Sequence, residues 1–305
     1  MVILQKNIMA ILNRCAHWIF FLSLSFCLQA EQPFITARLW GRLGNHLFII
    51  AATTSLALDN DAIPVFHDLV KEFEPKSLKN SNYVIGNLHA NYTHLFYKLN
   101  TSNHDSQIEC VYREPFFAYS PIHFRPNMLL EGWFQSEKYF AHHKNEILDL
   151  FAPSETIIEY LTNKYLHIIE NPRTVSVHLR CYTKENPKLD IVYPTYGREY
   201  FMKAMQYFHP DSQFVVFSDD CQWAKEQLAN IAGNILFIEG EEYYHDFYLM
   251  SLCKHNIICN STFSWWAAYL NKNPEKIVIV PNLWFKPEYN HNTKDLIPGD
   301  WTMID

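Results

Sequence analysis

Strand-like and helix-like segments alternate along the second half of the chain, and this order limits the folds that the chain can adopt. Each strand-like segment is a short run rich in β-branched and aromatic residues, and a helix-length segment follows it. The predicted strands span residues 174–179, 214–217, 234–238, 256–259 and 276–280, and the predicted helices span 199–207, 221–230, 247–254 and 264–270. Because parallel strands need such crossovers, the alternation predicts an α/β fold with a parallel sheet. The loops at the carboxyl ends of its strands then lie together, where open α/β sheets bind ligands.

The first half of the chain shows the same order more sparsely. The elements predicted there are strands over 34–40 and 63–66 and helices over 47–58 and 154–169. Residues 71–127 are rich in Tyr, His and Asn and allow no assignment. We therefore expect two α/β halves, at residues 33–170 and 171–305, with the boundary near Pro172.

Composition and charge exclude several classes of protein. Of the 305 residues, 49% are apolar and 19% are charged, so the chain can bury a sizeable core and is not disordered as a whole. The net charge of −7 argues against a general nucleic-acid binder, which needs a basic surface. An anionic ligand would need a local cluster of donors that opposes this global field. The 7 Cys show no CxxC spacing, which favours scattered buried thiols over a zinc site, with a single disulfide as the alternative.

The N-terminal residues are predicted to be a targeting segment. Residues 1–30 contain no Asp or Glu, and Lys6 and Arg14 precede an apolar run over residues 15–28. The run is shorter than the roughly 20 residues that span a bilayer comfortably. It resembles a secretory signal peptide, and the alternatives are a short uncleaved membrane anchor and a start codon placed too early.

Two candidate sites follow predicted strands. Gly41 and Gly44 permit close backbone approach before a helix N-terminus, and Asn45 lies within reach of a ligand there, although such a turn is often purely structural. His178 and Arg180 point to the same face of the sheet at the carboxyl end of the strand predicted over residues 174–179. A guanidinium at that position can bind a diphosphate through two hydrogen bonds. The alternatives are an interdomain salt bridge for Arg180 and a packed histidine.

Two further candidate sites have the same placement. Asp219 and Asp220 close the strand that ends at residue 217; Asp219 is suited to bind nucleoside hydroxyl or N–H groups, and Asp220 to cap the next helix. Residues 260–264 join a strand to a helix, and their hydroxyl side chains and backbone N–H groups can form a phosphate cradle. The same segment contains an N-glycosylation sequon, but a loop buried at a ligand site is a poor oligosaccharide acceptor.

Six motifs, taken in order, resemble one known family. They are GRLGN (41–45), GWFQSEKYF (132–140), VHLR (177–180), FSDD (217–220), DFYLMSLCKHNIICNSTFSWWAAYL (246–270) and NLWF (282–285). Together they cover nearly all of the chain after the targeting segment. They resemble glycosyltransferase family 11, the α-1,2-fucosyltransferases.

The resemblance implies a fold and an activity. The fold is GT-B-like, with two Rossmann-like α/β halves, an acceptor half and a GDP-sugar donor half, on either side of a nucleotide-sugar cleft. The activity is the inverting transfer of L-fucose from GDP-fucose to the 2-hydroxyl of a terminal β-galactoside, with no metal or other cofactor. The targeting segment then implies membrane association, in the Golgi lumen of a eukaryote or at the cytoplasmic face of a bacterial inner membrane.

The resemblance also carries residue roles. His178 and Arg180 match the start of the family's HxRRxD donor motif and are the implied catalytic residues. The implied donor-binding residues are Gly41, Gly44, Asn45, Asp219, Asn260, Ser261, Thr262 and Ser264.

The chain departs from the family pattern directly after this motif. Cys181 and Thr183 stand where a second Arg and an Asp are usual, and Lys184 or Lys188 is the available compensation. The departure keeps two alternatives open: transfer from a different nucleotide-sugar, and a carbohydrate-binding relative without turnover.

An inverting displacement also needs a base for the acceptor proton. Asp246, Glu131 and Asp190 are available carboxylates, and no spacing selects among them.

Overall fold

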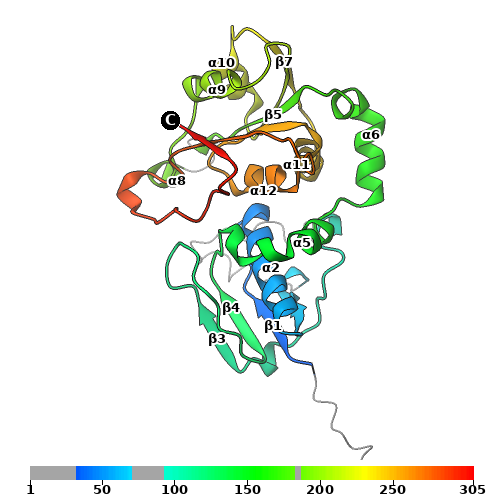
Figure 1. Cartoon of the computed structure of the whole chain (residues 1–305), viewed down its shortest axis with the longest axis vertical. Helices are drawn as coiled ribbons and strands as arrows, with labels where there is room; N and C mark the ends of the chain where they lie inside the picture. The colour runs from blue at the N-terminus through cyan, green and yellow to red at the C-terminus, as the bar shows by residue number, and fades with distance from the viewer. Residues whose placement is uncertain (1–31, 71–92, 183–186) are drawn as a thin grey trace, which may run out of the picture. The chain divides into compact units, whose positions relative to one another are not determined.

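The computed structural model describes residues 32–70, 93–182 and 187–305 (Figure 1). Residues Phe34–Asp305 form one compact unit, and the architecture below belongs to it. The targeting segment predicted for residues 1–30 lies outside the described residues. Within the described ranges, no helix combines the length and the apolar character that crossing a bilayer requires.

The first half is built on a four-stranded parallel sheet with the order β2-β1-β4-β3. Its strands are β1 (Phe34–Ala37), β2 (Ile63–Val65), β3 (Cys110–Arg113) and β4 (Met128–Glu131). Helix α2 (Leu43–Asp59) connects β1 to β2 and is buried along most of its length, as its apolar sequence predicts. Strand β3 lies in the region where the sequence allowed no assignment.

The second half is built on a six-stranded parallel sheet with the order β10-β9-β8-β5-β6-β7. Its strands are β5 (Thr174–Leu179), β6 (Gln213–Ser218), β7 (Asn234–Phe237), β8 (His255–Ile257), β9 (Val278–Pro281) and β10 (Thr302–Ile304). The chain order reverses at β5, since β6 and β7 follow on one side and β8 to β10 lie on the other. Open α/β sheets bind ligands at such a switch point, beside the carboxyl ends of the strands.

Helices follow the strands as the alternation predicts. They are α8 (Pro187–Val192), α9 (Arg198–Met205), α10 (Cys221–Leu228), α11 (Tyr243–Leu252) and α12 (Thr262–Leu270). The 3-10 helices η3 (Glu137–Tyr139) and η4 (Ala141–His143) and the helices α5 (Lys144–Leu150) and α6 (Glu155–Ile169) join the two halves. Ser154 caps α6 by accepting a hydrogen bond from the Ile157 N–H. The predicted two-half parallel α/β fold is confirmed.

The close approach of α2 and α12 joins the two halves (Figure 1). A Cβ atom built on Gly44 would lie 2.4 Å from the backbone carbon of Thr262, so only glycine fits at this position. Behind this contact, the Phe48 ring lies 4.4 Å from Trp265 and 5.1 Å from Trp266 between ring centroids. Large aromatic groups in close packing contribute strongly to core stability, so the contact is both tight and hydrophobic.

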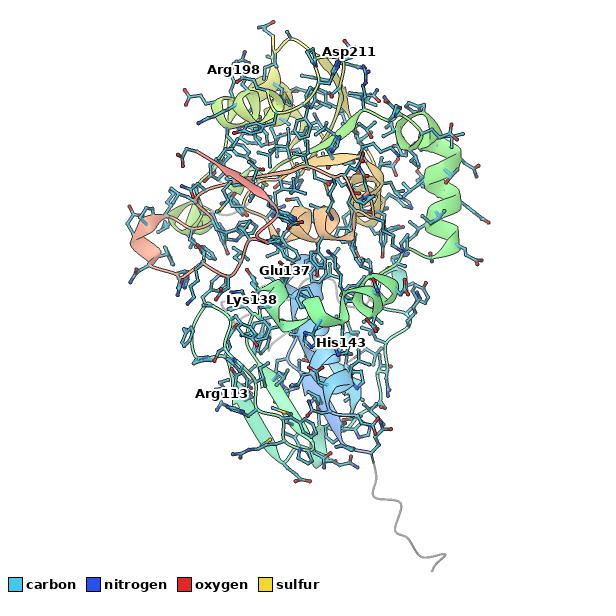
Figure 2. All side chains as sticks on the ribbon, in the orientation of Figure 1. Arg113, Glu137, Lys138, His143, Arg198 and Asp211 are labelled. Carbon is cyan, nitrogen blue, oxygen red and sulfur yellow. The ribbon has the colours of Figure 1, made fainter. Side chains whose placement is uncertain are left out.

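Asp295 ties the halves together a second time. Its side chain is almost fully buried and forms a 2.5 Å ion pair with Lys138, which Figure 2 labels on η3. Its second oxygen accepts a hydrogen bond from the Tyr119 N–H at 3.2 Å. One hydrophobic core also contains residues of both halves. The division at residues 170 and 171 therefore stays a prediction, although the two sheets occupy separate stretches of the chain.

Replacing Gly44 should separate the two helices. We expect Gly44→Ala to lower the free energy of unfolding by about 1–3 kcal/mol, because the new methyl group overlaps backbone atoms that cannot rotate away. Chemical denaturation measures the change. Gly299→Ala is the matched control, since nothing lies within 4 Å of its Cβ position. If the two variants were equally stable, the close contact between α2 and α12 at Gly44 would be contradicted.

Candidate functional site

A cavity of about 630 Å³ opens at the switch point of the second sheet, and both halves line it. The first half contributes the loop between β1 and α2, and the second contributes the loops after β5, β6 and β8. All but one of the predicted site residues line it, namely Gly41, Gly44, Asn45, His178, Arg180, Asp219, Asn260, Ser261 and Thr262. Ser264 is the exception: it is buried, and its hydroxyl donates to the Ser261 carbonyl at 3.2 Å.

Arg180 and Asp219 form an ion pair in the cavity wall. Arg180 Nη1 lies 3.1 Å from Asp219 Oδ2, and the other carboxylate oxygen accepts the Cys181 N–H at 3.0 Å. The Arg180 guanidinium also lies 5.6 Å from the centre of the Tyr182 ring. Both partners belong to the second half, so this is not the interdomain salt bridge considered from the sequence. The pair holds the guanidinium in place at the cavity.

Asp220 and the cysteines follow their predicted structural roles. Asp220 caps α10 by accepting the Trp223 N–H at 2.9 Å. The five cysteines of the described residues are free thiols, as predicted. Cys181 is buried and does not line the cavity, so its side chain offers no donor to a ligand there. Thr183 and Lys184 lie outside the described residues, as does the Lys188 side chain.

Arg42 brings a second guanidinium to the cavity. Loss of solvent lowers the pKa of Arg42, and the positive charge of Arg180 lowers it further. A cation destabilised by another cation gains from an anion that binds near both. In a chain of net charge −7, this pair is the local donor cluster that an anionic ligand requires. Arg42 lies in the GRLGN motif, but no spacing in the sequence indicates that it faces Arg180.

His178 is a buried neutral imidazole. Its Nδ1 lies 3.3 Å from Cys259 Sγ. Burial, followed by the charge of Arg180, lowers the pKa of His178 to about 3. An imidazole with so low a pKa is unprotonated near neutral pH and is a weak base, so it suits hydrogen bonding and orientation better than proton transfer.

The loop before α12 combines an anchor with an anion site. Asn260 donates to the Pro194 and Trp284 carbonyls at 3.0 and 3.1 Å and is almost fully buried, so it is a poor sequon. Ser261 is the N-cap of α12, and its side chain makes no capping hydrogen bond. The positive end of the helix dipole therefore faces the cavity with backbone N–H groups that suit phosphate oxygens.

Asp246, in the first turn of α11, presents a buried carboxyl group to the cavity. Its Oδ1 is buried and has no hydrogen-bond partner. Burial, and to a smaller extent the charge of Glu241, raises the pKa of Asp246 to about 7. Of the other carboxylates considered from the sequence, Glu131 pairs with Arg113 outside this cavity, and the Asp190 side chain is not described. A buried carboxyl oxygen without a partner is open to a hydrogen bond from an N–H or O–H group.

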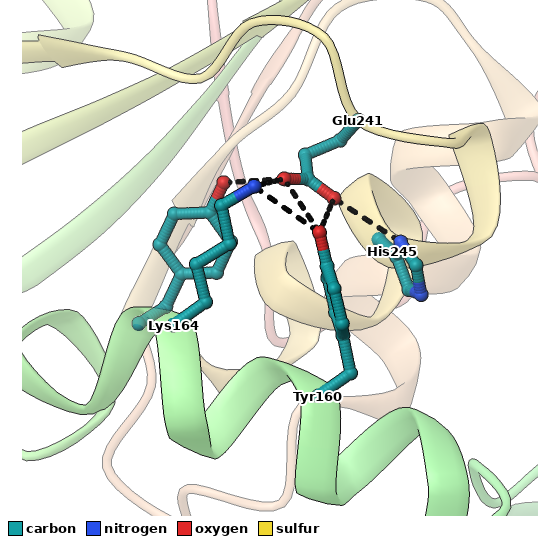
Figure 3. Close-up of polar contacts among 5 residues, drawn as sticks. Tyr160, Lys164, Glu241 and His245 are labelled. Atoms are coloured by element: carbon teal, nitrogen blue, oxygen red, sulfur yellow. Dashed lines mark hydrogen bonds and ion pairs between the residues drawn. The ribbon is translucent and has the colours of Figure 1, made fainter.

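Glu241 anchors the start of α11 to helix α6 (Figure 3). Its nearly buried carboxylate accepts hydrogen bonds from Tyr165 at 2.7 Å, Tyr160 at 3.1 Å and His245 Nδ1 at 3.1 Å, and it pairs with Lys164. Burial acts to raise the pKa of Glu241, but the hydrogen bonds from Lys164 and Tyr165 outweigh it and lower the pKa. The anchored carboxylate fixes the turn that carries Asp246.

One group of side chains among the described residues has the spacing of a metal site. The ligand atoms of Asp59, His142 and His143 lie within 4.8 Å of one another. Asp59 is the last residue of α2, whereas the cavity lies at the start of that helix, and none of the three lines it. The predicted independence of metal stays a prediction.

Comparison with known proteins gives a family and several relatives. The sequence model described as Glycosyl transferase family 11 matches residues 40–305. The O-antigen biosynthesis glycosyltransferase WbnK of Escherichia coli is 33% identical over 184 residues, which cover 57% of this chain and 60% of that protein. The alpha-1,2-colitosyltransferase of Escherichia coli is 32% identical over 182 residues, covering 57% and 61%. Galactoside alpha-(1,2)-fucosyltransferase 1 of Leontopithecus chrysomelas is 28% identical over 166 residues, covering 48% and 43%.

The matched regions span less than two thirds of these relatives. Among solved structures, the chain is similar to the fucosyltransferase NodZ from Bradyrhizobium, with a TM-score of 0.46 and 15% identity over 78% of this chain and 92% of that one.

The buried charge of Asp246 should make stability depend on pH. Its folded-state pKa of about 7 exceeds the usual value of 3.8, so the ionised form is disfavoured by folding. The cost to stability grows as the pH rises from about 4 to 7 and is complete above pH 7.

Asp246→Asn removes this cost. We expect the variant to gain stability over the wild type at pH 8, by a few kcal/mol at most, and to gain little at pH 4. Denaturation series at the two pH values measure the difference. Asp211→Asn, at an exposed ion pair with Arg173, is the control. A constant difference for Asp246→Asn across the two pH values would contradict the raised pKa.

Proposed function

Since the chain belongs to glycosyltransferase family 11, and is therefore a glycosyltransferase, we propose that it transfers L-fucose from GDP-fucose to the 2-hydroxyl of a terminal β-galactoside. The family match supports the resemblance on which this proposal began. The observation that carries it is the convergence of Arg180, Arg42 and the N-terminus of α12 on one cavity at the switch point of the donor-side sheet. That is a site for the diphosphate of a nucleotide-sugar.

In the proposed reaction, the galactose 2-hydroxyl oxygen attacks the anomeric carbon of fucose while the bond from that carbon to the GDP oxygen breaks. The configuration inverts, the bonding electrons leave with GDP, and the hydroxyl proton passes to a base. Negative charge grows on the β-phosphate as the bond breaks. In this proposal Arg180, Arg42 and the α12 N–H groups stabilise that charge, and the reaction needs no metal ion.

We propose that Asp246 binds the guanine base. Its Oδ1 has no hydrogen-bond partner, and Asp246 lines the same cavity as Phe217, Tyr243 and Phe263. Aromatic rings suit a planar base, and a carboxylate can accept both N–H groups on the Watson–Crick edge of guanine. Uridine and adenine nucleotides do not offer that pair of donors, so this contact would select GDP.

A second candidate is transfer of a different sugar from the same kind of donor. The alpha-1,2-colitosyltransferase is nearly as similar to this chain as WbnK is, at 32% and 33% identity. Colitose is fucose without the 3-hydroxyl, so a site for one sugar is close in shape to a site for the other. Competition between the two GDP-sugars in one reaction separates these candidates.

Product analysis tests the activity. The full-length protein is incubated with GDP-fucose and either lactose or N-acetyllactosamine, with and without EDTA. We expect mass spectrometry to show one deoxyhexose added at galactose O2, in amounts that EDTA does not reduce. Multiple turnovers would eliminate the carbohydrate-binding relative without catalysis. Absence of both transfer and GDP release would contradict the proposal.

Arg180 should be essential to transfer and not to folding. We expect Arg180→Lys to lower kcat/KM by about 100- to 1,000-fold, since lysine cannot bind the diphosphate through two hydrogen bonds. Initial rates of GDP release give the change, and circular dichroism checks the fold. Arg173→Lys, at an exposed ion pair with Asp211, is the matched control. If Arg180→Lys had the same kcat/KM as the wild type, the proposed binding of the diphosphate by Arg180 would be contradicted.

A further inference from the structure

Two histidines and one aspartate form a cluster at the end of α2 that is remote from the cavity. Asp59 is the last residue of α2, and His142 and His143 belong to η4, in the segment that joins the two halves (Figure 2 labels His143). The side chains of Asp59, His142 and His143 are 42%, 49% and 23% exposed. An ion can therefore reach them from solvent, and water can complete its coordination.

The three side chains have the spacing of ligands around one metal ion. His142 Nε2 lies 2.9 Å from Asp59 Oδ2, and His143 Nε2 lies 2.8 Å from Asp59 Oδ1. Two atoms that bind one ion at about 2.1 Å, with an angle of about 90° to 109° between the bonds, lie about 2.9–3.4 Å apart. One ligand atom from each residue lies within 4.8 Å of the others, so small side-chain rotations bring all three around an ion.

The ligand types select the class of ion. Imidazole nitrogen suits Zn²⁺ and its neighbours among the divalent transition metals, whereas Ca²⁺ and Mg²⁺ take oxygen ligands. Burial acts to raise the pKa of Asp59, but the hydrogen bonds from His142 and His143 outweigh it and lower that pKa. The carboxylate is therefore ionised near neutral pH, and a divalent cation can bind it without displacing a proton.

The end of α2 favours a cation. The carbonyl groups at the C-terminus of a helix carry a partial negative charge, which stabilises positive charge within the last turn. The last turn of α2, residues 56–59, contains no Lys, Arg or His in the sequence. A divalent ion bound to Asp59 offsets both the charge of the carboxylate and the negative end of the helix dipole.

The packing of η4 against α2 holds the ligands in place. Ser55 is buried one turn before Asp59, and its hydroxyl lies 3.2 Å from His142 Nε2. The backbone N–H of His143 donates to the Phe140 carbonyl at 3.0 Å, and the Phe140 ring is fully buried in the core. Ligands carried by packed elements keep their positions before the ion arrives, which lowers the entropic cost of binding.

We infer that Asp59, His142 and His143 form a binding site for a divalent transition metal ion of the Zn²⁺ type. The Asp59 carboxylate and the Nε2 atoms of both histidines are the ligands, and water occupies the remaining positions. Each imidazole then carries its hydrogen on Nδ1, so that Nε2 donates its electron pair to the ion. The bound ion joins the end of α2 to η4 and stabilises the folded protein. The site lies outside the donor cavity, and the inference does not rest on the proposed function.

Metal titration tests the site. The full-length protein, without an affinity tag, is freed of metal with EDTA, dialysed and titrated with ZnCl2 by isothermal calorimetry. We expect a binding step that His142→Gln and His143→Gln each weaken by about 10-fold or more, because losing even an outer partner of a metal ligand has an effect of that size. His209→Gln is the matched control, since His209 is an exposed histidine beside Asp211, and it should leave the step unchanged.

Thermal denaturation and Co²⁺ absorption give independent readouts. At about 100 times its Kd, Zn²⁺ should raise the Tm of the wild type by several degrees, because the ion binds the folded state in preference to the unfolded one. The Tm of Asp59→Asn should rise much less. Co²⁺ in place of Zn²⁺ should give visible absorption bands typical of nitrogen ligands, and a variant that combines His142→Gln and His143→Gln should lose them.

Each outcome decides the inference. If both histidine variants bound Zn²⁺ as tightly as the wild type, the wild type would hold an adventitious ion only, and the inference would be overturned. A wild-type protein that binds neither Zn²⁺ nor Co²⁺ would overturn it as well. Should His143→Gln fail to fold, His142→Gln decides alone, because the His142 side chain is half exposed and its replacement leaves the core intact.

Discussion

The site depends on how closely α2 and α12 approach each other. Gly44 leaves room for the backbone of Thr262, and the Asn45 side chain, one residue further, accepts the Thr262 hydroxyl. These helices belong to different halves, so one contact sets the distance between the glycine loop and the loop before α12. A side chain at residue 44 would push apart the two loops that line the cavity. The apolar sequence of both helices follows from this arrangement, because each is surrounded by protein on most sides.

The buried charges of the cavity are arranged at a cost to stability. The negative charge of Glu241 disfavours ionisation of Asp246, and Asp246 Oδ1 has no hydrogen-bond partner. Glu241 has four hydrogen-bonding or ionic partners, which stabilise its negative charge. The carboxylate whose ionised form is disfavoured is therefore Asp246, which lines the cavity. Arg42 and Arg180 likewise raise each other's electrostatic energy. Charged groups that the protein itself stabilises poorly are the ones that gain most free energy when a ligand of opposite charge or a hydrogen-bond donor binds to them.

Much of the fold and of the site could be predicted from the sequence. The strand–helix alternation after Pro172 predicted the parallel sheet, and the polar residues that end β5 and β6 were predicted to lie at its binding edge. Ser264 was predicted to bind the donor as part of a hydroxyl-rich loop, yet it bonds to the Ser261 carbonyl and does not line the cavity. Strand β3 was missed because it is short, and its sequence does not differ from the irregular segment around it.

The sequence by itself determined the elements, the order of the motifs and the residue types at each strand end, because local patterning and turn chemistry are written in neighbouring residues. Only the tertiary structure decided which side chains share a cavity. Arg42 and Arg180 are far apart in the chain, and so are Gln135 and Asn45. The proximity of Arg42 to Arg180 follows from the packing of two helices across the halves. No local pattern records the partner of a side chain, because burial and hydrogen bonding between distant segments are decided only when the core closes.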